Sequence, residues 1–173
     1  MRLFVAVFPD DTVNAAVDAA LELALRRGPD GGRWRPVARE RRHVTLRFHA
    51  DAEPDEVAAG LRGAPLRAPT LSCAGTGIFG TALWLGVHAD DRDTWHTLLR
   101  AVGTDPADHV AHLTIARCRG HVPAVPPGLD GHAGPHWTPR AVVLVASGSP
   151  YRVLEEFPLV ATPGADEVVG GPR

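Results

Sequence analysis

Hydrophobic and polar positions follow strand and helix periods in short segments along the chain. Apolar runs and alternating apolar and polar positions predict strands at 2–8, 34–37, 42–49, 66–78, 81–88, 110–119, 140–147 and 151–160. Helical spacing predicts helices over 11–27, capped by Asp11 or Thr12, and over 54–62 and 91–102. Segment 122–139 is rich in Pro and Gly, has no period and is predicted to be a loop. Strands and helices that interleave, with hairpin-like neighbours, predict an α+β fold with antiparallel sheets.

The length of 173 residues, with 45% hydrophobic residues, is enough for one globular domain with a sizeable core. We expect residues 1–160 to form this domain and the polar segment 161–173 to be a disordered tail. No apolar run approaches the roughly 18 residues that span a bilayer, and the apolar start is too short for a signal peptide. Two cysteines without a CxxC pair, Cys73 and Cys118, fit a reducing compartment, so a cytoplasmic protein without a membrane partner is expected.

All 18 basic residues are arginine, because the sequence contains no lysine. This composition excludes a P-loop, Schiff-base or pyridoxal-phosphate chemistry, and a ligase that adenylates its own lysine. The net charge of −2 means that any nucleic-acid site must be local. Between residues 33 and 47, a basic segment either attracts phosphate groups or is a solvated surface. Its arginines are Arg33, Arg35, Arg39, Arg41, Arg42 and Arg47, against Glu40 alone.

Two of the predicted strands carry the same polar pattern, His-x-Thr, at His43 and Thr45 and at His112 and Thr114. Residues two apart on a strand point to one face, about 6.6–6.8 Å apart. A third such spacing, at His136, lies between prolines and lacks the aliphatic alternation, so we do not include it. Each motif therefore forms a rigid unit in which the imidazole can act as an acid or a base and the threonine hydroxyl can donate a hydrogen bond.

The paired motifs resemble those of the two-histidine (2H) phosphoesterase superfamily. Within it, the chain resembles the RNA 2′,3′-cyclic phosphodiesterases, also called bacterial 2′-5′ RNA ligase-like proteins. The resemblance covers most of residues 1–160 and is carried, in order, by segments 1–7, 33–34, 43–48, 77–79, 83–84, 112–117 and 151–159.

This resemblance implies two pseudo-symmetric lobes with antiparallel sheets around a central cleft. It also implies metal-independent hydrolysis of RNA or nucleoside 2′,3′-cyclic phosphate ends to 2′-phosphates, with no cofactor. By the same resemblance, the two imidazoles face each other and supply the acid and the base for in-line attack on the cyclic phosphodiester. His43 is then the acid toward O3′ and His112 the base on the attacking water, while Thr45 and Thr114 donate hydrogen bonds to the non-bridging oxygens. The implied partner is RNA with a cyclic phosphate end or a cyclic nucleotide, and no protein partner is implied.

Five further residues are candidates for substrate binding. Arg47 follows Thr45 at the regular alternate position, so it is expected on the motif face unless it is merely solvated. Arg117 reaches the corresponding face only if a bulge corrects its register. The other three candidates are aromatic side chains that could stack on a base: Trp34, Phe79 and Tyr151. For Trp34 and Phe79, packing in the core is the alternative.

Three alternatives to this hypothesis stay open. A metal site could use the ligand-like spacings 109–112 and 132–136 with Cys73 and Cys118, although no CxxC or HExxH motif frames them. A 2H enzyme could instead act on a small cyclic phosphate such as an ADP-ribose derivative. The same fold could also serve as a noncatalytic RNA-end-binding module, which would have no need for two facing imidazoles.

Overall fold

The computed structural model describes residues 1–161 of the chain. Its helices are α1 (Asp11–Arg27), α2 (Pro54–Arg62) and α3 (Arg92–Ala101), and three single 3-10 turns occupy Gly31–Arg33, Arg39–Arg41 and Pro106–Asp108. The strands are β1 (Leu3–Val7), β2 (Arg35–Pro36), β3 (Val44–His49), β4 (Arg67–Ala68), β5 (Leu71–Phe79), β6 (Ala82–Ala89), β7 (His112–Arg117), β8 (Ala141–Ala146), β9 (Arg152–Pro158) and β10 (Val160–Ala161).

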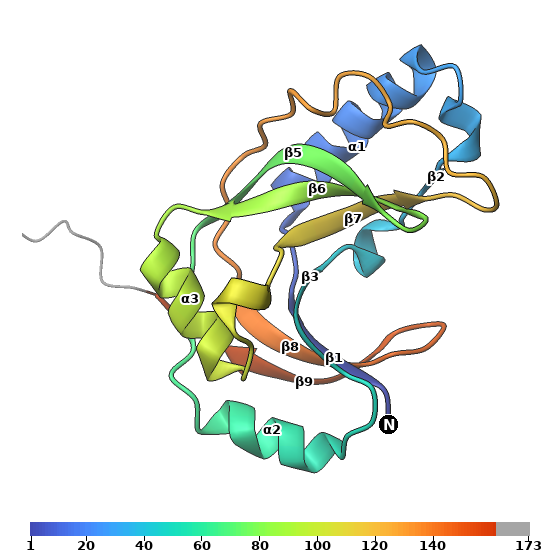
Figure 1. Ribbon diagram of the computed structural model, residues 1–173. Helices are drawn as coiled ribbons and strands as arrows, with labels where there is room; N and C mark the ends of the chain where they lie inside the picture. The colour runs from blue at the N-terminus through green and yellow to red at the C-terminus, as the bar shows by residue number, and fades with distance from the viewer. Residues whose placement is uncertain (162–173) are drawn as a thin grey trace, which may run out of the picture.

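Two four-stranded sheets dominate the fold (Figure 1). The first sheet has the strand order β3-β1-β8-β9 and the second has the order β2-β7-β6-β5. Every pairing within these two sheets is antiparallel, whereas the short strands β4 and β10 pair in parallel. This arrangement confirms the predicted α+β fold with antiparallel sheets.

One continuous hydrophobic core joins the two sheets. On the first sheet, Leu3, Val5 and Val7 of β1 belong to this core, as do Leu83 and Leu85 of the second sheet. In Figure 1, α1 lies on the side of the second sheet, although it follows β1 of the first, and α2 lies below the first sheet. The two sheets therefore pack against each other through one shared core, and the chain passes from one sheet to the other several times.

A separate small apolar cluster covers the other face of the first sheet. Phe4 and Ala6 of β1 form it together with Val143 and Val145 of β8, and Tyr151 packs at its edge. Successive side chains of a strand point to opposite faces, so β1 serves the main core with one face and this cluster with the other. The candidate site lies on this second face.

The sequence patterns located the elements but missed several boundaries. The side chain of Asp10, rather than Asp11 or Thr12, caps α1 by accepting a hydrogen bond from the Val13 backbone N–H at 2.9 Å. The predicted strand 66–78 is divided into β4 and β5, and 151–160 into β9 and β10. Loop 122–139 has no helix or longer strand, yet it bridges to β5 through Trp137 and Ala133.

The predicted disordered tail lies outside the described residues, apart from Ala161, which belongs to β10. Within residues 1–161, none of the helices combines the length and the apolar character needed to cross a membrane.

Candidate active site

His43 and His112 are held by the same backbone device. His43 immediately precedes β3 and His112 begins β7, and each Nδ1 lies 2.8 Å from the carbonyl oxygen two residues earlier in the chain. A carbonyl oxygen can only accept, so Nδ1 carries the hydrogen in both rings. No described residue hydrogen-bonds to either Nε2, so this atom is left to accept or to donate a proton to a substrate.

Aromatic rings surround His43 on the first sheet. Phe4 stacks on its imidazole with ring centroids 4.6 Å apart, Tyr151 meets it edge-on at 5.6 Å, and Phe8 lies at 5.8 Å. The guanidinium of Arg41 in turn lies 4.6 Å from the centre of the Tyr151 ring. The ring of His43 is therefore fixed by packing as well as by its hydrogen bond.

Burial is the largest influence on His43 and lowers its pKa from the ordinary value of 6.5. The hydrogen bond to the Arg41 carbonyl acts in the opposite direction. The positive charges of His112, Arg117 and Arg41 lower the pKa further. Because His112 and Arg117 belong to β7, these electrostatic interactions connect the two motif strands.

His112 has aromatic neighbours of its own on the second sheet. Phe79 meets it edge-on at 5.2 Å, and the Trp84 ring lies at 6.1 Å. Trp84 occupies the space over Gly77, where an added Cβ would lie only 2.3 Å from the indole. A glycine is thus required at this position for Trp84 to lie beside the histidine.

Both motif threonines lie on the faces that carry the histidines. Thr45 pairs with Ala6, which belongs to the apolar cluster of that face, and Thr114 pairs with Trp84. Within residues 1–161, no hydrogen bond engages either threonine hydroxyl, so both are available to a ligand.

A bulge in β3 contradicts the expected position of Arg47. Val5 pairs with Arg47 and the next residue of β1 pairs with Thr45, so Leu46 is the extra residue. The alternation is shifted there, and Arg47 shares the core-side face with Val5. Its guanidinium lies against Gly103 after α3, where an added Cβ would come within 2.3 Å of Nη1. The prediction of an uninterrupted alternation through Arg47 was wrong.

The corresponding bulge in β7 has the opposite consequence. Leu83 pairs with Ala116 and Trp84 with Thr114, so Ile115 is the extra residue. Ile115 and Ala116 are both buried, and Arg117 returns to the face of Thr114 and is exposed. The condition set by the sequence, that Arg117 needs a bulge to face the site, is met.

The three aromatic candidates have different environments. Trp34 is 3% exposed and donates its indole N–H to the Ala124 carbonyl at 3.3 Å, so it belongs to the core. Phe79 is 47% exposed beside His112, and Tyr151 is half-buried beside His43. Phe79 and Tyr151 are therefore placed to meet a base, and Trp34 is not.

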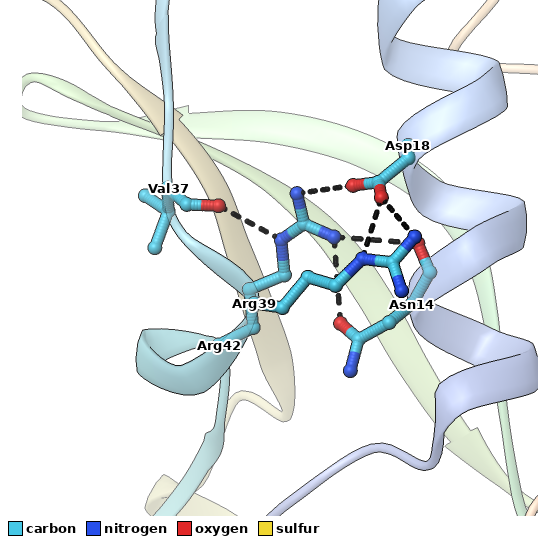
Figure 2. Close-up of polar contacts among 5 residues, drawn as sticks. All are labelled: Asn14, Asp18, Val37, Arg39 and Arg42. Carbon is cyan, nitrogen blue, oxygen red and sulfur yellow. Dashed lines mark hydrogen bonds and ion pairs between the residues drawn. The ribbon is translucent and has the colours of Figure 1, made fainter.

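The basic segment does not form one patch, because Arg39 and Arg42 turn to α1 (Figure 2). The buried guanidinium of Arg42 donates to the Val37 carbonyl at 3.0 Å and to Asn14 at 3.4 Å, and it pairs with Asp18 at 2.6 Å. Arg39 pairs with the same carboxylate at 2.5 Å. Burial acts to raise the pKa of Asp18, but the hydrogen bonds from both arginines outweigh it and lower the pKa.

Two side chains from the segment before β7 hold the outer edge of β3. His109 donates from Nε2 to the Thr45 carbonyl at 2.8 Å, and Thr104 donates to the Leu46 carbonyl at 2.7 Å. Nδ1 of His109 is buried without a partner, and its ring meets Trp95 of α3 edge-on. Burial lowers the pKa of His109 and so favours the neutral ring, and Nε2 carries the hydrogen because the Thr45 carbonyl can only accept. Because β3 is at the edge of its sheet, these two hydrogen bonds satisfy carbonyl oxygens that have no neighbouring strand on that side.

The residues considered for a metal site are not brought together. Across residues 1–161, no three His, Cys, Asp or Glu side chains lie close enough to hold a metal ion. His136 instead meets Asp90 at 3.1 Å. Cys73 and Cys118 are buried, and burial raises the pKa of Cys73 to about 11, which disfavours its thiolate.

Two antiparallel sheets that each present one His-x-Thr strand define a 2H phosphoesterase. The chain is 33% identical, over 98% of its length and 96% of the relative's, to a Thermus thermophilus protein named RNA 2′,3′-cyclic phosphodiesterase. The chain belongs to the RNA 2′,3′-cyclic phosphodiesterase family. No family model matches the sequence.

Solved structures agree with this assignment. The protein TT0787 of Thermus thermophilus is 30% identical, with a TM-score of 0.62 over 92% of this chain and 98% of the other. LigT of E. coli, in a complex with 3′-AMP, is 20% identical, with a TM-score of 0.62 over 91% of this chain and 97% of LigT. At that identity, the second comparison supports the fold alone.

The buried cluster around Arg42 generates a stability prediction. Arg42→Met leaves the Val37 and Asn14 oxygens without their donor and lowers the free energy of unfolding by about 3 kcal/mol. The control Arg39→Met removes an exposed arginine from the same carboxylate and costs at most about 1 kcal/mol. Urea denaturation at pH 7 measures both, and equal losses would contradict the role of burial.

The same cluster predicts a pH dependence. Because the pKa of Asp18 is lowered in the folded protein, its ion pair contributes stability above the ordinary value of 3.8 and loses it as pH falls through the lowered pKa. The difference in stability between wild type and Arg42→Met therefore narrows below about pH 4.

The hydrogen bond from His109 predicts a second effect. His109→Phe removes the donor to the Thr45 carbonyl and costs about 1–3 kcal/mol of stability, with a loss of activity because the first motif is displaced. His109→Gln can still donate an N–H to that carbonyl, so it is expected to recover part of the stability and part of the activity. If glutamine and phenylalanine behave alike in unfolding and in turnover, the hydrogen bond is not what matters.

Proposed function

We propose that this enzyme hydrolyses RNA or nucleoside 2′,3′-cyclic phosphate ends to 2′-phosphates by a metal-independent two-histidine mechanism. Family membership supports the 2′,3′-cyclic phosphodiesterase activity. The observation that carries the mechanism is the matched pair of imidazoles, each with Nδ1 bonded to a backbone carbonyl at 2.8 Å and with Nε2 free. That arrangement supports the proposal because it leaves Nε2 of each ring free to exchange a proton with the substrate.

The proposed step is an in-line displacement at phosphorus. His112 accepts a proton at Nε2 from the attacking water as the new P–O bond forms. The P–O3′ bond breaks on the opposite side, and the leaving O3′ takes the proton that His43 carries at Nε2. The product keeps a phosphate on O2′, and solvent restores both histidines to their starting protonation states.

Charge on the phosphoryl group is stabilised from both sheets in this proposal. The free hydroxyls of Thr45 and Thr114 donate to the non-bridging oxygens, where negative charge accumulates. Arg117 adds a positive charge on the same face, close enough to affect the pKa of His43. Phe79 and Tyr151 offer aromatic surfaces on which the terminal base stacks.

The lowered pKa of His43 works against its role as the acid in the free enzyme, because an acid must be protonated. A bound phosphodiester carries a negative charge, and an opposite charge nearby favours the protonated imidazole. Substrate binding therefore raises the pKa of His43 toward the value that proton donation needs.

The reaction product tests the proposed function directly. Nucleoside 2′,3′-cyclic monophosphates and oligonucleotides with cyclic phosphate ends are incubated with enzyme in EDTA, and the products are compared with authentic 2′- and 3′-phosphates by chromatography. We expect predominantly 2′-phosphate. A mainly 3′-phosphate product would refute the assignment of O3′ as leaving group, and activity that zinc alone restores would refute metal independence.

Removing either imidazole tests the proposed mechanism. His43→Ala and His112→Ala each lower kcat by about 10²–10⁴-fold, because each deletes a positioned acid or base, and circular dichroism shows an unchanged fold. Thr45→Ala and Thr114→Ala cost less, since each removes one hydrogen bond to the phosphoryl oxygens. A histidine variant that keeps more than about a tenth of the wild-type rate would rule out the mechanism.

The pH profile tests the pair of histidines. A bell-shaped curve of kcat/KM is expected, because one imidazole must be neutral and the other protonated. The two limbs report the histidines as a pair, and His43 contributes a limb below pH 6.5 because burial lowers its pKa. Arg41→Gln removes a positive charge that lowers this pKa, so the limb shifts to higher pH. An unchanged profile in Arg41→Gln would contradict the contribution of His43, and a flat profile through pH 5–9 would contradict the two-histidine mechanism.

A further inference from the structure

Arg35 and Arg117 lie directly opposite each other on neighbouring strands β2 and β7. Cross-strand partners point to one face with Cβ atoms about 5 Å apart, and like charges in that arrangement destabilise a sheet. Both side chains are exposed, and neither has a hydrogen bond or an ion pair to an acidic group among residues 1–161. An anion held between the two guanidinium groups would relieve their repulsion.

The pair points to the face of the active site. Arg117 shares that face with Thr114 because of the bulge at Ile115. The neighbour of Arg35 on β2, Pro36, pairs with buried Ala116 and lines a pocket beside α1 on the opposite face. Since successive residues of a strand alternate, Arg35 projects toward the catalytic side.

The strand register places the arginine pair close to Thr114, which contacts the reacting phosphate in the proposed mechanism. Thr114 and Arg117 are opposite Trp84 and Ala82, which are two residues apart on β6, so they are about 7 Å apart along the strands. Phe79 also pairs with Ala82, so an exposed aromatic ring and two guanidinium groups follow one another in a row across the second sheet. A strand of RNA presents this combination of bases and evenly spaced phosphates.

We propose that Arg35, next to Arg117, forms a second phosphate subsite that binds the phosphodiester on the 5′ side of the terminal nucleotide. Planar guanidinium forks match the geometry of a phosphate diester, and two of them share its negative charge. This inference rests on the proposed function and makes RNA oligomers with cyclic ends better substrates than cyclic mononucleotides, which lack that phosphate.

The test compares adenosine 2′,3′-cyclic phosphate with the dinucleotide ApA that ends in a 2′,3′-cyclic phosphate. Arg35→Gln raises KM for the dinucleotide about 5–10-fold and changes the mononucleotide constants by less than about twofold. The salt dependence of log KM for the dinucleotide becomes shallower by about 0.7, the value for one lost phosphate contact on a single strand. Arg92→Gln, at the exposed start of α3, makes the same charge change elsewhere and has no such effect.

Equal effects of Arg35→Gln on both substrates, or the same small effect as Arg92→Gln, would overturn the subsite. A wild-type protein that hydrolyses neither substrate would overturn the proposed function instead. Thermal shift with the dinucleotide that ends in a 2′-phosphate tests the subsite without turnover, because a ligand of the folded state raises Tm. That ligand is expected to raise Tm of wild type more than that of Arg35→Gln, and equal shifts would refute the subsite.

Discussion

The buried guanidinium of Arg42 joins the segment that carries His43 to α1. A buried charge needs a full set of partners, and Arg42 finds them in the Val37 carbonyl, Asn14 and Asp18. Two of these partners, Asn14 and Asp18, are on α1 (Figure 2), and α1 lies beside the second sheet (Figure 1). Because His43 is the next residue, this network connects the candidate histidine of the first sheet to α1, which lies beside the second sheet.

The two motif strands have the same local structure but place the arginine that follows the threonine on different faces. In each, a histidine is held through Nδ1 by the carbonyl two residues earlier, a threonine follows on the same face, and a bulge comes directly after the threonine. The bulge at Leu46 turns Arg47 to α3, whereas the one at Ile115 turns Arg117 to the site. A nearly symmetric pair of strands thus produces an asymmetric arrangement of positive charge, with Arg117 on the face of its His-x-Thr motif and Arg47 on the opposite face of its strand.

Contacts between the halves occur where the strand pairing is interrupted. β3 is an edge strand, and the Thr45 and Leu46 carbonyls at its bulge accept hydrogen bonds from His109 and Thr104, which precede β7. The same residues that satisfy the backbone of the first motif therefore lie a few positions before the second motif. This short segment therefore links the backbone of the first motif strand to the start of the second.

Alternation along 42–49 and 110–119 was enough to predict both motif strands and to place each histidine with its threonine, because the period of two is a property of one strand. The roles of the arginines depended on the tertiary structure. A bulge arises from the register with a neighbouring strand. The pattern within 43–48 therefore cannot show whether Arg47 lies on the face of His43 and Thr45 or on the core-side face. Likewise, the partners of Arg42 and of the Trp34 indole, Asn14 and Ala124, lie 28 and 90 residues away. Local sequence therefore determined the two candidate His-x-Thr units, and long-range packing decided which charged side chains share their faces.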